Sequence, residues 1–234
     1  MSGGDRPLDR PIWEALSTTH ASMAEGGSLA KRYPREVSPL AALREQSPEA
    51  YAALGRLLAP EEAAVLFLNE PPRPPAGWTL VRDGRLEQRV CSAPPAPPRS
   101  AAGIEPLGPD EAPEMLALAE LTKPGPFRSR TVEFGGYIGI RDAGRLVAMA
   151  GQRTRPAGYT EISAVCTHPD ARGRGHAEAL IAALARTIFG RGEIPFLGVR
   201  PDNEGARRLY ERLGFKVRAV QRLAVVAQNA PSLL

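Results

Sequence analysis

The stretch Val165-Cys-Thr-His-Pro-Asp-Ala-Arg-Gly-Arg-Gly-His-Ala177 is the most informative part of this 234-residue sequence. It predicts a strand that ends at Pro169, a loop from Arg172 to Gly175, and then an apolar-periodic helix. The first N–H groups of a helix lack internal partners and carry partial positive charge, so they bind anions such as phosphate. No Ser, Thr, Asp or Asn directly precedes Ala177 to cap these groups. The loop is therefore a candidate pyrophosphate site.

Other phosphate-binding loops fit this stretch less well. A Walker A loop places Lys and then Ser or Thr after its last glycine, whereas His176 and Ala177 follow Gly175. A dinucleotide fingerprint needs a third spaced glycine and, about 20 positions further on, an acidic residue at the end of a second strand. Here the segment 190–193 is expected to be a turn. A tight turn with two solvated arginines, before an ordinary surface helix, is the alternative that binds nothing.

A second motif follows about 30 residues downstream, in Pro201-Asp-Asn-Glu-Gly-Ala-Arg-Arg-Leu-Tyr-Glu-Arg-Leu-Gly-Phe215. This segment predicts a helix with Asp202 or Asn203 as its N-cap and Gly214 at its C-terminal end. Asn203 and Tyr210 are seven residues apart, so they share one helix face and lie roughly 10 Å apart along the axis. Both polar side chains therefore point the same way.

The pattern Arg-x-x-Gly-x-Ala, from Arg172 to Ala177, resembles the acetyl-CoA pyrophosphate loop of GNAT-family N-acetyltransferases. The pattern Asn-x-x-Ala-x-x-Leu-Tyr-x-x-Leu-Gly-Phe, from Asn203 to Phe215, is similar to the C-terminal part of the same enzymes. The resemblance covers residues from about 103 to 223. It implies an α/β (α+β) fold of the GNAT type, in which helices flank a mixed central sheet.

The resemblance also implies how acetyl-CoA is bound. In this family the strand before the loop splays from its neighbour, and the pantetheine arm pairs with the exposed backbone. The loop glycines hold the pyrophosphate, and Arg172 and Arg174 would add charge. Asn203 would reach the pantetheine or its amides. The implied cofactor-binding residues are Val165, Cys166, Thr167, Arg172, Gly173, Arg174, Gly175, His176, Ala177 and Asn203.

Two catalytic residues are implied, each with a plainer alternative. Tyr210 would be the general acid that protonates the leaving thiolate, or else a core residue beside Phe215. Glu161 lies where some family members carry the glutamate that deprotonates the amine, or else it is a solvated strand-end residue. The other position that the family uses for a carboxylate is Gly198 here. Cys166 is expected to be a small buried hydrophobe rather than a nucleophile.

The expected reaction is transfer of an acetyl group from acetyl-CoA to a primary amine of a small molecule or amino acid, directly within a ternary complex. The alternative is a catalytically silent CoA-binding regulatory module, which would keep the loop but need neither Glu161 nor Tyr210. Arg128 and Arg130 could hold a carboxylate of the acceptor, or could be solvated loop residues.

Composition narrows the class of protein further. Two cysteines provide no disulfide framework, which favours a reducing, cytoplasmic setting. The beginning of the sequence has no apolar signal core, and no run approaches the length of a membrane span. The net charge of +4 is modest and forms no basic stripe with interleaved aromatics, so no nucleic-acid partner is expected. We expect no metal and either a monomer or a homodimer.

The proline-rich run near Ser92 predicts a linker at 93–102 between an N-terminal lobe, 1–92, and an acetyltransferase domain, 103–234. The N-terminal lobe is a candidate degenerate copy of the same fold, without a CoA loop. Its expected helices are Pro11–Leu16, Leu40–Leu43 and Pro48–Leu58, the last capped by Ser47, and its strands are Ala63–Leu68, Trp78–Val81 and Leu86–Cys91. In the second part we expect a strand at Gly103–Leu107, a helix from its cap Asp110 to Thr122, and a hairpin of Tyr137–Ile140 with Leu146–Ala150. We then expect a strand with Glu161, a strand at Pro195–Arg200 and a last strand at Arg222–Ala227.

Overall fold

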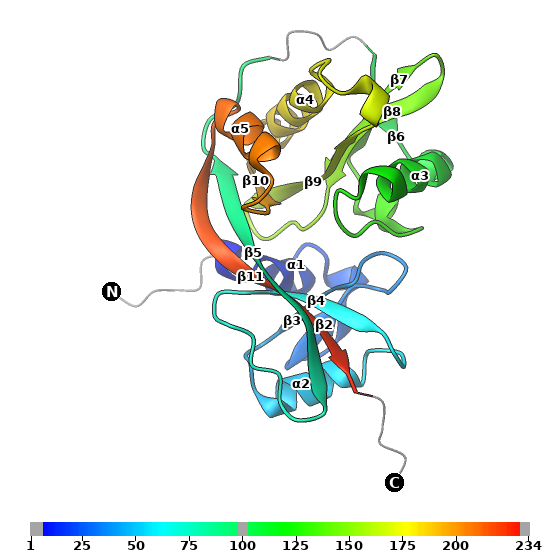
Figure 1. Cartoon of the computed structure of the whole chain (residues 1–234). Coiled ribbons are helices and arrows are strands. Elements are labelled where there is room, and N and C mark those ends of the chain that lie inside the picture. The colour runs from blue at the N-terminus through cyan, green and yellow to red at the C-terminus, as the bar shows by residue number, and fades with distance from the viewer. Residues whose placement is uncertain (1–6, 98–102, 230–234) are drawn as a thin grey trace.

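The computed structural model describes residues 7–97 and 103–229, and within them one mixed sheet runs through the molecule. Residues 98–102 of the expected linker lie outside the described residues. The strand order is β1-β2-β3-β4-β11-β5-β10-β9-β8-β7-β6. Helices flank this sheet, which confirms the expected α/β class (Figure 1).

The elements of the N-terminal part are α1 (Pro11–Ser17), β1 (Glu25–Gly26), β2 (Ala30–Arg32), β3 (Leu40–Leu43), α2 (Pro48–Gly55), β4 (Ala63–Leu68) and β5 (Trp78–Cys91). Those that follow are β6 (Ile104–Leu107), α3 (Ala112–Thr122), β7 (Tyr137–Asp142), β8 (Arg145–Gln152), β9 (Tyr159–Thr167), α4 (His176–Gly190), β10 (Ile194–Val199), α5 (Glu204–Arg212) and β11 (Phe215–Gln228). From β6 to α5 the order is the expected β-α-β-β-β-α-β-α.

Two predictions that depend only on neighbouring residues, the Ser47 cap and the β7–β8 hairpin, are confirmed. The Ser47 side chain caps α2 by accepting a hydrogen bond from the Ala50 N–H at 3.3 Å. β7 and β8 form the expected hairpin, in which Ala143 and Gly144 at the turn have φ of 49° and 81°. Two consecutive positive φ angles match the right-handed twist of the flanking strands.

Some expectations about single elements were wrong. Leu40–Leu43 is strand β3 and not a helix, because it pairs with β2 and β4, and a short apolar run does not distinguish the two. Asp110 does not cap α3. A 3₁₀ turn precedes this helix, and the Glu111 carboxylate accepts the Gly108 N–H at 2.7 Å.

The long strands β5 and β11 tie the two ends of the molecule together (Figure 1). The two strands expected at 78–81 and 86–91 are one strand, β5, and the last strand begins at Phe215 rather than Arg222. β5 lies between β10 and β11, and β11 also pairs with β4. Strands from both sides of the proline-rich run therefore alternate in the sheet.

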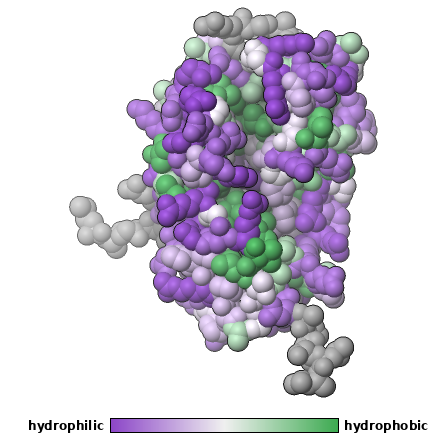
Figure 2. Space-filling model, in the orientation of Figure 1, coloured by the Kyte–Doolittle hydropathy of each residue, from purple (hydrophilic) through white to green (hydrophobic). Residues whose placement is uncertain are grey.

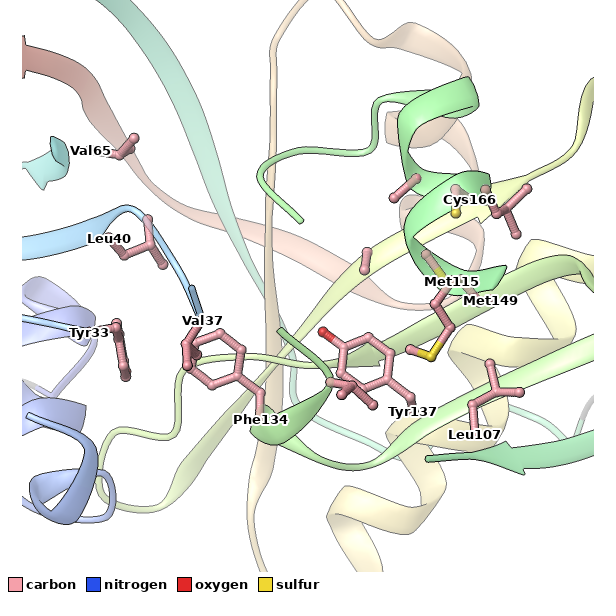
Figure 3. Packing of buried hydrophobic residues seen from close by; sticks show 14 of the residues in the cluster. Tyr33, Val37, Leu40, Val65, Leu107, Met115, Phe134, Tyr137, Met149 and Cys166 are labelled. Atoms are coloured by element: carbon pink, nitrogen blue, oxygen red, sulfur yellow. The ribbon is translucent and has the colours of Figure 1, made fainter. Parts of the chain in front are cut away.

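A hydrophobic core also crosses that run. Its members come from both parts of the chain and include Tyr33, Val37, Leu40, Val65, Leu107, Met115, Phe134, Tyr137, Met149 and Cys166 (Figure 3). A side-chain hydrogen bond supports the same packing, because the Thr131 hydroxyl donates to the Val37 carbonyl at 2.6 Å. Figure 2 shows apolar residues grouped along the middle of one face, between borders of polar residues.

Candidate active site

The parallel strands β9 and β10 diverge at the centre of the sheet. They pair only where Tyr159–Glu161 lies beside Ile194–Phe196. β9 then continues to Thr167 alongside β8, while β10 continues to Val199 alongside β5. Beyond Glu161, no strand of the described residues pairs with β9 on its β10 side. Because backbone polar groups need partners, this wedge suits a ligand with amides of its own.

A β-bulge shapes the free arm of β9. The β8–β9 register shifts by one residue between the pairs Met149–Cys166 and Gly151–Ser163, and Ala164 there has φ of 52°. A bulge bends its strand and redirects the following residues. It therefore separates the position of Glu161 from the segment Val165–Thr167, which the resemblance implies for the pantetheine.

The loop after β9 leads into the N-terminus of α4. Gly173 and Gly175 have φ of 78° and 80°, and the space beside both is open. α4 begins at His176, one residue before the expected start, and no side chain caps it. A 15-residue helix therefore presents its unpaired N–H groups and the positive end of its dipole beside the wedge.

The two loop arginines differ in what they contact. Arg174 donates to the Asp142 carboxylate at 2.9 Å and to the Asp170 carbonyl at 3.3 Å, which ties the loop to the β7–β8 turn. Arg172 is exposed, and its side chain makes no ion pair with the described residues. Arg172 is therefore the better placed of the two for an anionic ligand.

The second motif lies on α5. Asn203, rather than Asp202, is the N-cap, because its side-chain oxygen accepts the Ala206 N–H at 3.2 Å. Its amide NH₂ group is not used by this contact. Tyr210 is 8% exposed and packs in the hydrophobic cluster that also contacts Val165 and Ala177. Burial raises the pKa of Tyr210 to about 12, so its hydroxyl is protonated at neutral pH.

Glu161 is buried and bound by an arginine and a hydroxyl group, which the sequence did not reveal. Its carboxylate accepts from Arg153 at 2.6 and 3.0 Å and from the Thr154 hydroxyl at 2.7 Å. The guanidinium of Arg153 also lies 5.7 Å from the centre of the Phe67 ring. A carboxylate buried inside a strand requires a cationic or hydrogen-bonding partner. This requirement alone could have predicted an arginine near Glu161 from the sequence.

The other candidates are placed as follows. Cys166 is buried, and burial raises the pKa of its thiol to about 11, so a reactive thiolate is disfavoured at neutral pH. Arg130 pairs with Glu133 at 2.5 Å, and no contact brings it or Arg128 to the wedge. No described contact joins Glu161 to Tyr210.

The part of the chain that the structure describes contains neither a group of three or more His, Cys, Asp or Glu side chains that could hold a metal ion nor a helix long and apolar enough to cross a membrane.

Comparisons with known proteins agree with this fold. The model of the FR47-like protein family matches residues 137–225. The structure of a candidate acetyltransferase of the GNAT family from Novosphingobium aromaticivorans is 38% identical, with a TM-score of 0.89, over 97% of this chain and 100% of that one. A GCN5-related N-acetyltransferase from Kribbella flavida is 21% identical, with a TM-score of 0.64 over 99% and 98%, and supports the fold alone.

The chain therefore belongs to the GNAT family of acetyltransferases. Among curated proteins, it is similar to the N-alpha-acetyltransferase RimI of Mycobacterium tuberculosis (strain ATCC 25618 / H37Rv), with 38% identity over 84 residues. This match spans 34% of the chain and about half, 51%, of that relative.

Proposed function

We propose that this GNAT-family acetyltransferase uses acetyl-CoA as its acyl donor and acetylates a primary amine of a small molecule or amino acid. The observation that carries the proposal is the uncapped N-terminus of α4 beside the β9–β10 wedge. A helix end of this kind favours a pyrophosphate, and an unpaired strand edge favours an amide chain. A pyrophosphate and an amide chain are both parts of one CoA molecule.

The chain has a suitable residue for each part of the cofactor. The backbone of Val165, Cys166 and Thr167 would pair with the pantetheine, and the N–H groups from Gly173 to Ala177, with Arg172, would hold the pyrophosphate. The free amide group of Asn203 would donate to the pantetheine. When bound, acetyl-CoA supplies an acetyl group activated as a thioester.

For the proton transfers we propose Tyr210 as the acid and Glu161 as the base. The high pKa of Tyr210 keeps a proton on its hydroxyl, which makes no hydrogen bond to any described residue and so can donate one. Glu161 lies at the apex of the wedge. Oxygen Oε1 of Glu161 accepts one hydrogen bond, from Arg153, and keeps a second lone pair for a proton or a bridging water.

The proposed acceptor class and the direct route of transfer each have one supporting observation. The name of the RimI relative refers to α-amino groups, and an amino acid carries one. Direct transfer to the amine is supported by the protonated state of Cys166, since a covalent route would need its thiolate.

The experiment is thiol release from acetyl-CoA with a panel of free amino acids, small amines and peptides with free N-termini. We expect saturable release with at least one amino acid or small amine, and none without an amine. Release with peptides alone would replace the proposed acceptor class. CoA binding by calorimetry without release for any amine would instead indicate the silent regulatory module.

A further inference from the structure

The N-terminal part of the molecule contains a second strand pair of the same design as β9 and β10. The parallel strands β3 and β4 are joined by α2, and they pair only at Leu40–Ala41 with Val65–Leu66 before they diverge. A cavity of about 250 Å³ opens where their pairing stops. It is lined by the ends of the two strands, by residues 44–46 and 69–70 after them, and by Arg10, Ile12 and Trp13.

This cavity differs from the β9–β10 wedge in its charged groups. The N-terminus of α2 is already capped by Ser47. The loop before it has no glycine, and Gln46 closes it by bonding to the Pro71 carbonyl at 3.1 Å and the Arg73 N–H at 2.8 Å. No open row of helix N–H groups faces the cavity, so a pyrophosphate has no cradle here.

Cations gather instead around one indole ring. Arg44, Lys31 and Arg10 lie 5.7, 5.8 and 5.9 Å from the centre of the Trp13 ring. Lys31 and Arg44 form no ion pair with a carboxylate of residues 7–97 or 103–229. The charges of Lys31 and Arg44 therefore repel one another beside this ring, and an anion next to Arg44 would relieve this repulsion.

Two acidic residues also border the cavity and limit the charge that it can accept. Glu70 is paired with Arg73 at 3.4 Å, and Glu45 is exposed. Lys31 and Arg44 stand against one exposed carboxylate, that of Glu45, so the surroundings of the cavity favour a ligand with a single negative charge.

The rest of the lining is apolar and sets the size of the ligand. Leu43, Leu66 and Leu68 contribute from the strands, together with Phe67. A dry cavity of about 150 Å³ binds benzene, so about 250 Å³ accommodates one ring or a short chain with a carboxylate arm. The Phe67 ring also contacts Arg153, so the cavity adjoins the Arg153–Glu161 pair without sharing those two residues.

We propose that this cavity is a second binding site, which takes a small organic carboxylate with an aromatic or aliphatic body. The carboxylate lies against Arg44 beside Trp13, and the apolar body lies among the leucines of β3 and β4. This proposal does not depend on the acceptor or on the catalytic residues proposed above.

The test uses Trp13 as the reporter. The chain has two tryptophans, so Trp78→Phe in the full-length protein leaves Trp13 as the only one. Phenylacetate and hexanoate, titrated with excitation at the tryptophan edge, are expected to change its emission saturably, with a Kd below about 10 mM. Phenylacetamide and hexanamide, which keep the shape and lose the charge, are expected to bind at least tenfold more weakly.

Matched charge variants complete the experiment. In the same background, Arg44→Gln is expected to weaken phenylacetate about tenfold. Arg56→Gln removes another exposed arginine, which does not line this cavity, and should leave the affinity unchanged. The melting temperature and CoA affinity report whether each variant is folded. The proposal is overturned if neither carboxylate binds, if the amides bind equally well, or if Arg44→Gln has no effect.

Discussion

Gly175 is a residue at which the proposed anion site depends on backbone conformation. Its φ of 80° is unfavourable for other residues, and a side chain there would extend into the space left for a ligand. We expect Gly175→Val to weaken CoA binding at least tenfold, measured by calorimetry. Gly192→Val is the matched control, because Gly192 has φ of 76° and equally open space at the other end of α4. Equal CoA affinity in both variants would mean that the phosphates bind elsewhere.

Glu161 and Tyr210 should be separable by the pH dependence of turnover. Glu161→Gln should slow the reaction most at neutral pH and recover in alkali, because the amine then loses its proton unaided. Tyr210→Phe should lower turnover by about 10²–10⁴-fold, and alkaline pH should not restore it. Because burial raises the pKa of Tyr210 to about 12, the wild-type acid keeps its proton in moderately alkaline solution.

Two controls accompany these variants. CoA affinity should stay within a few-fold, since neither residue belongs to the pyrophosphate loop. Glu161→Gln also leaves the buried Arg153 without its carboxylate, so its melting temperature must be followed. If Glu161 only positions Arg153, activity will be lost without alkaline recovery, and the base assignment fails.

His20 should make stability depend on pH in a defined window. It is buried, shares a hydrogen bond with the Tyr33 hydroxyl at 2.9 Å, and has its pKa lowered to about 4, first by burial and then by Arg155. Between pH 4 and 6.5 the unfolded chain binds the proton and the folded chain does not, so stability falls as pH falls. We expect the difference between wild type and His20→Gln in the free energy of unfolding to change by about 2 to 3 kcal/mol across this window. A constant difference would contradict the buried neutral imidazole.

At the scale of the elements, β5 carries a buried charge network in the centre of the sheet. Arg89 is 1% exposed and donates to Glu87 at 2.6 and 2.9 Å and to Glu211 at 3.0 Å. Arg89→Met should cost about 3–5 kcal/mol in urea unfolding, because it removes the main partner of a buried carboxylate. The double variant Glu87→Gln with Arg89→Met should recover much of this loss. A cost below about 1 kcal/mol for the single change would show that Arg207, at 3.3 Å from Glu87, is a sufficient partner.

At the scale of the whole molecule, the proposed division at 93–102 remains a statement about sequence and function, with CoA binding assigned to 103–234. The sheet, however, contains strands from both sides of this division, so the 103–234 segment depends on the N-terminal strands for its folding. A fragment that begins at 103 lacks β5 and β4, so β10 loses one neighbour and β11 loses both. We expect this fragment to be unfolded by circular dichroism, and coexpression with residues 1–97 to restore a folded complex. A monomeric, folded fragment that binds CoA alone would contradict this expectation.

The sequence by itself determined those features that depend on neighbouring residues. The uncapped start of α4 after Gly175, a side-chain cap for α5 from Asp202 or Asn203, and the β7–β8 hairpin all follow from short-range chemistry, and so do the two motifs that indicate the family. Capping groups, glycine torsions and helical periodicity act over a few residues, so a single sequence displays them directly.

Only the tertiary structure decided the features that join distant segments. Leu40–Leu43 is a strand because β2 and β4 provide its backbone partners. β5 lies in the sheet between β10 and β11, which follow it by about a hundred residues in the sequence. Glu161 forms an ion pair with Arg153 because β8 and β9 are adjacent antiparallel strands. Such contacts depend on which surfaces the whole chain can bury together, and local propensity does not encode that choice.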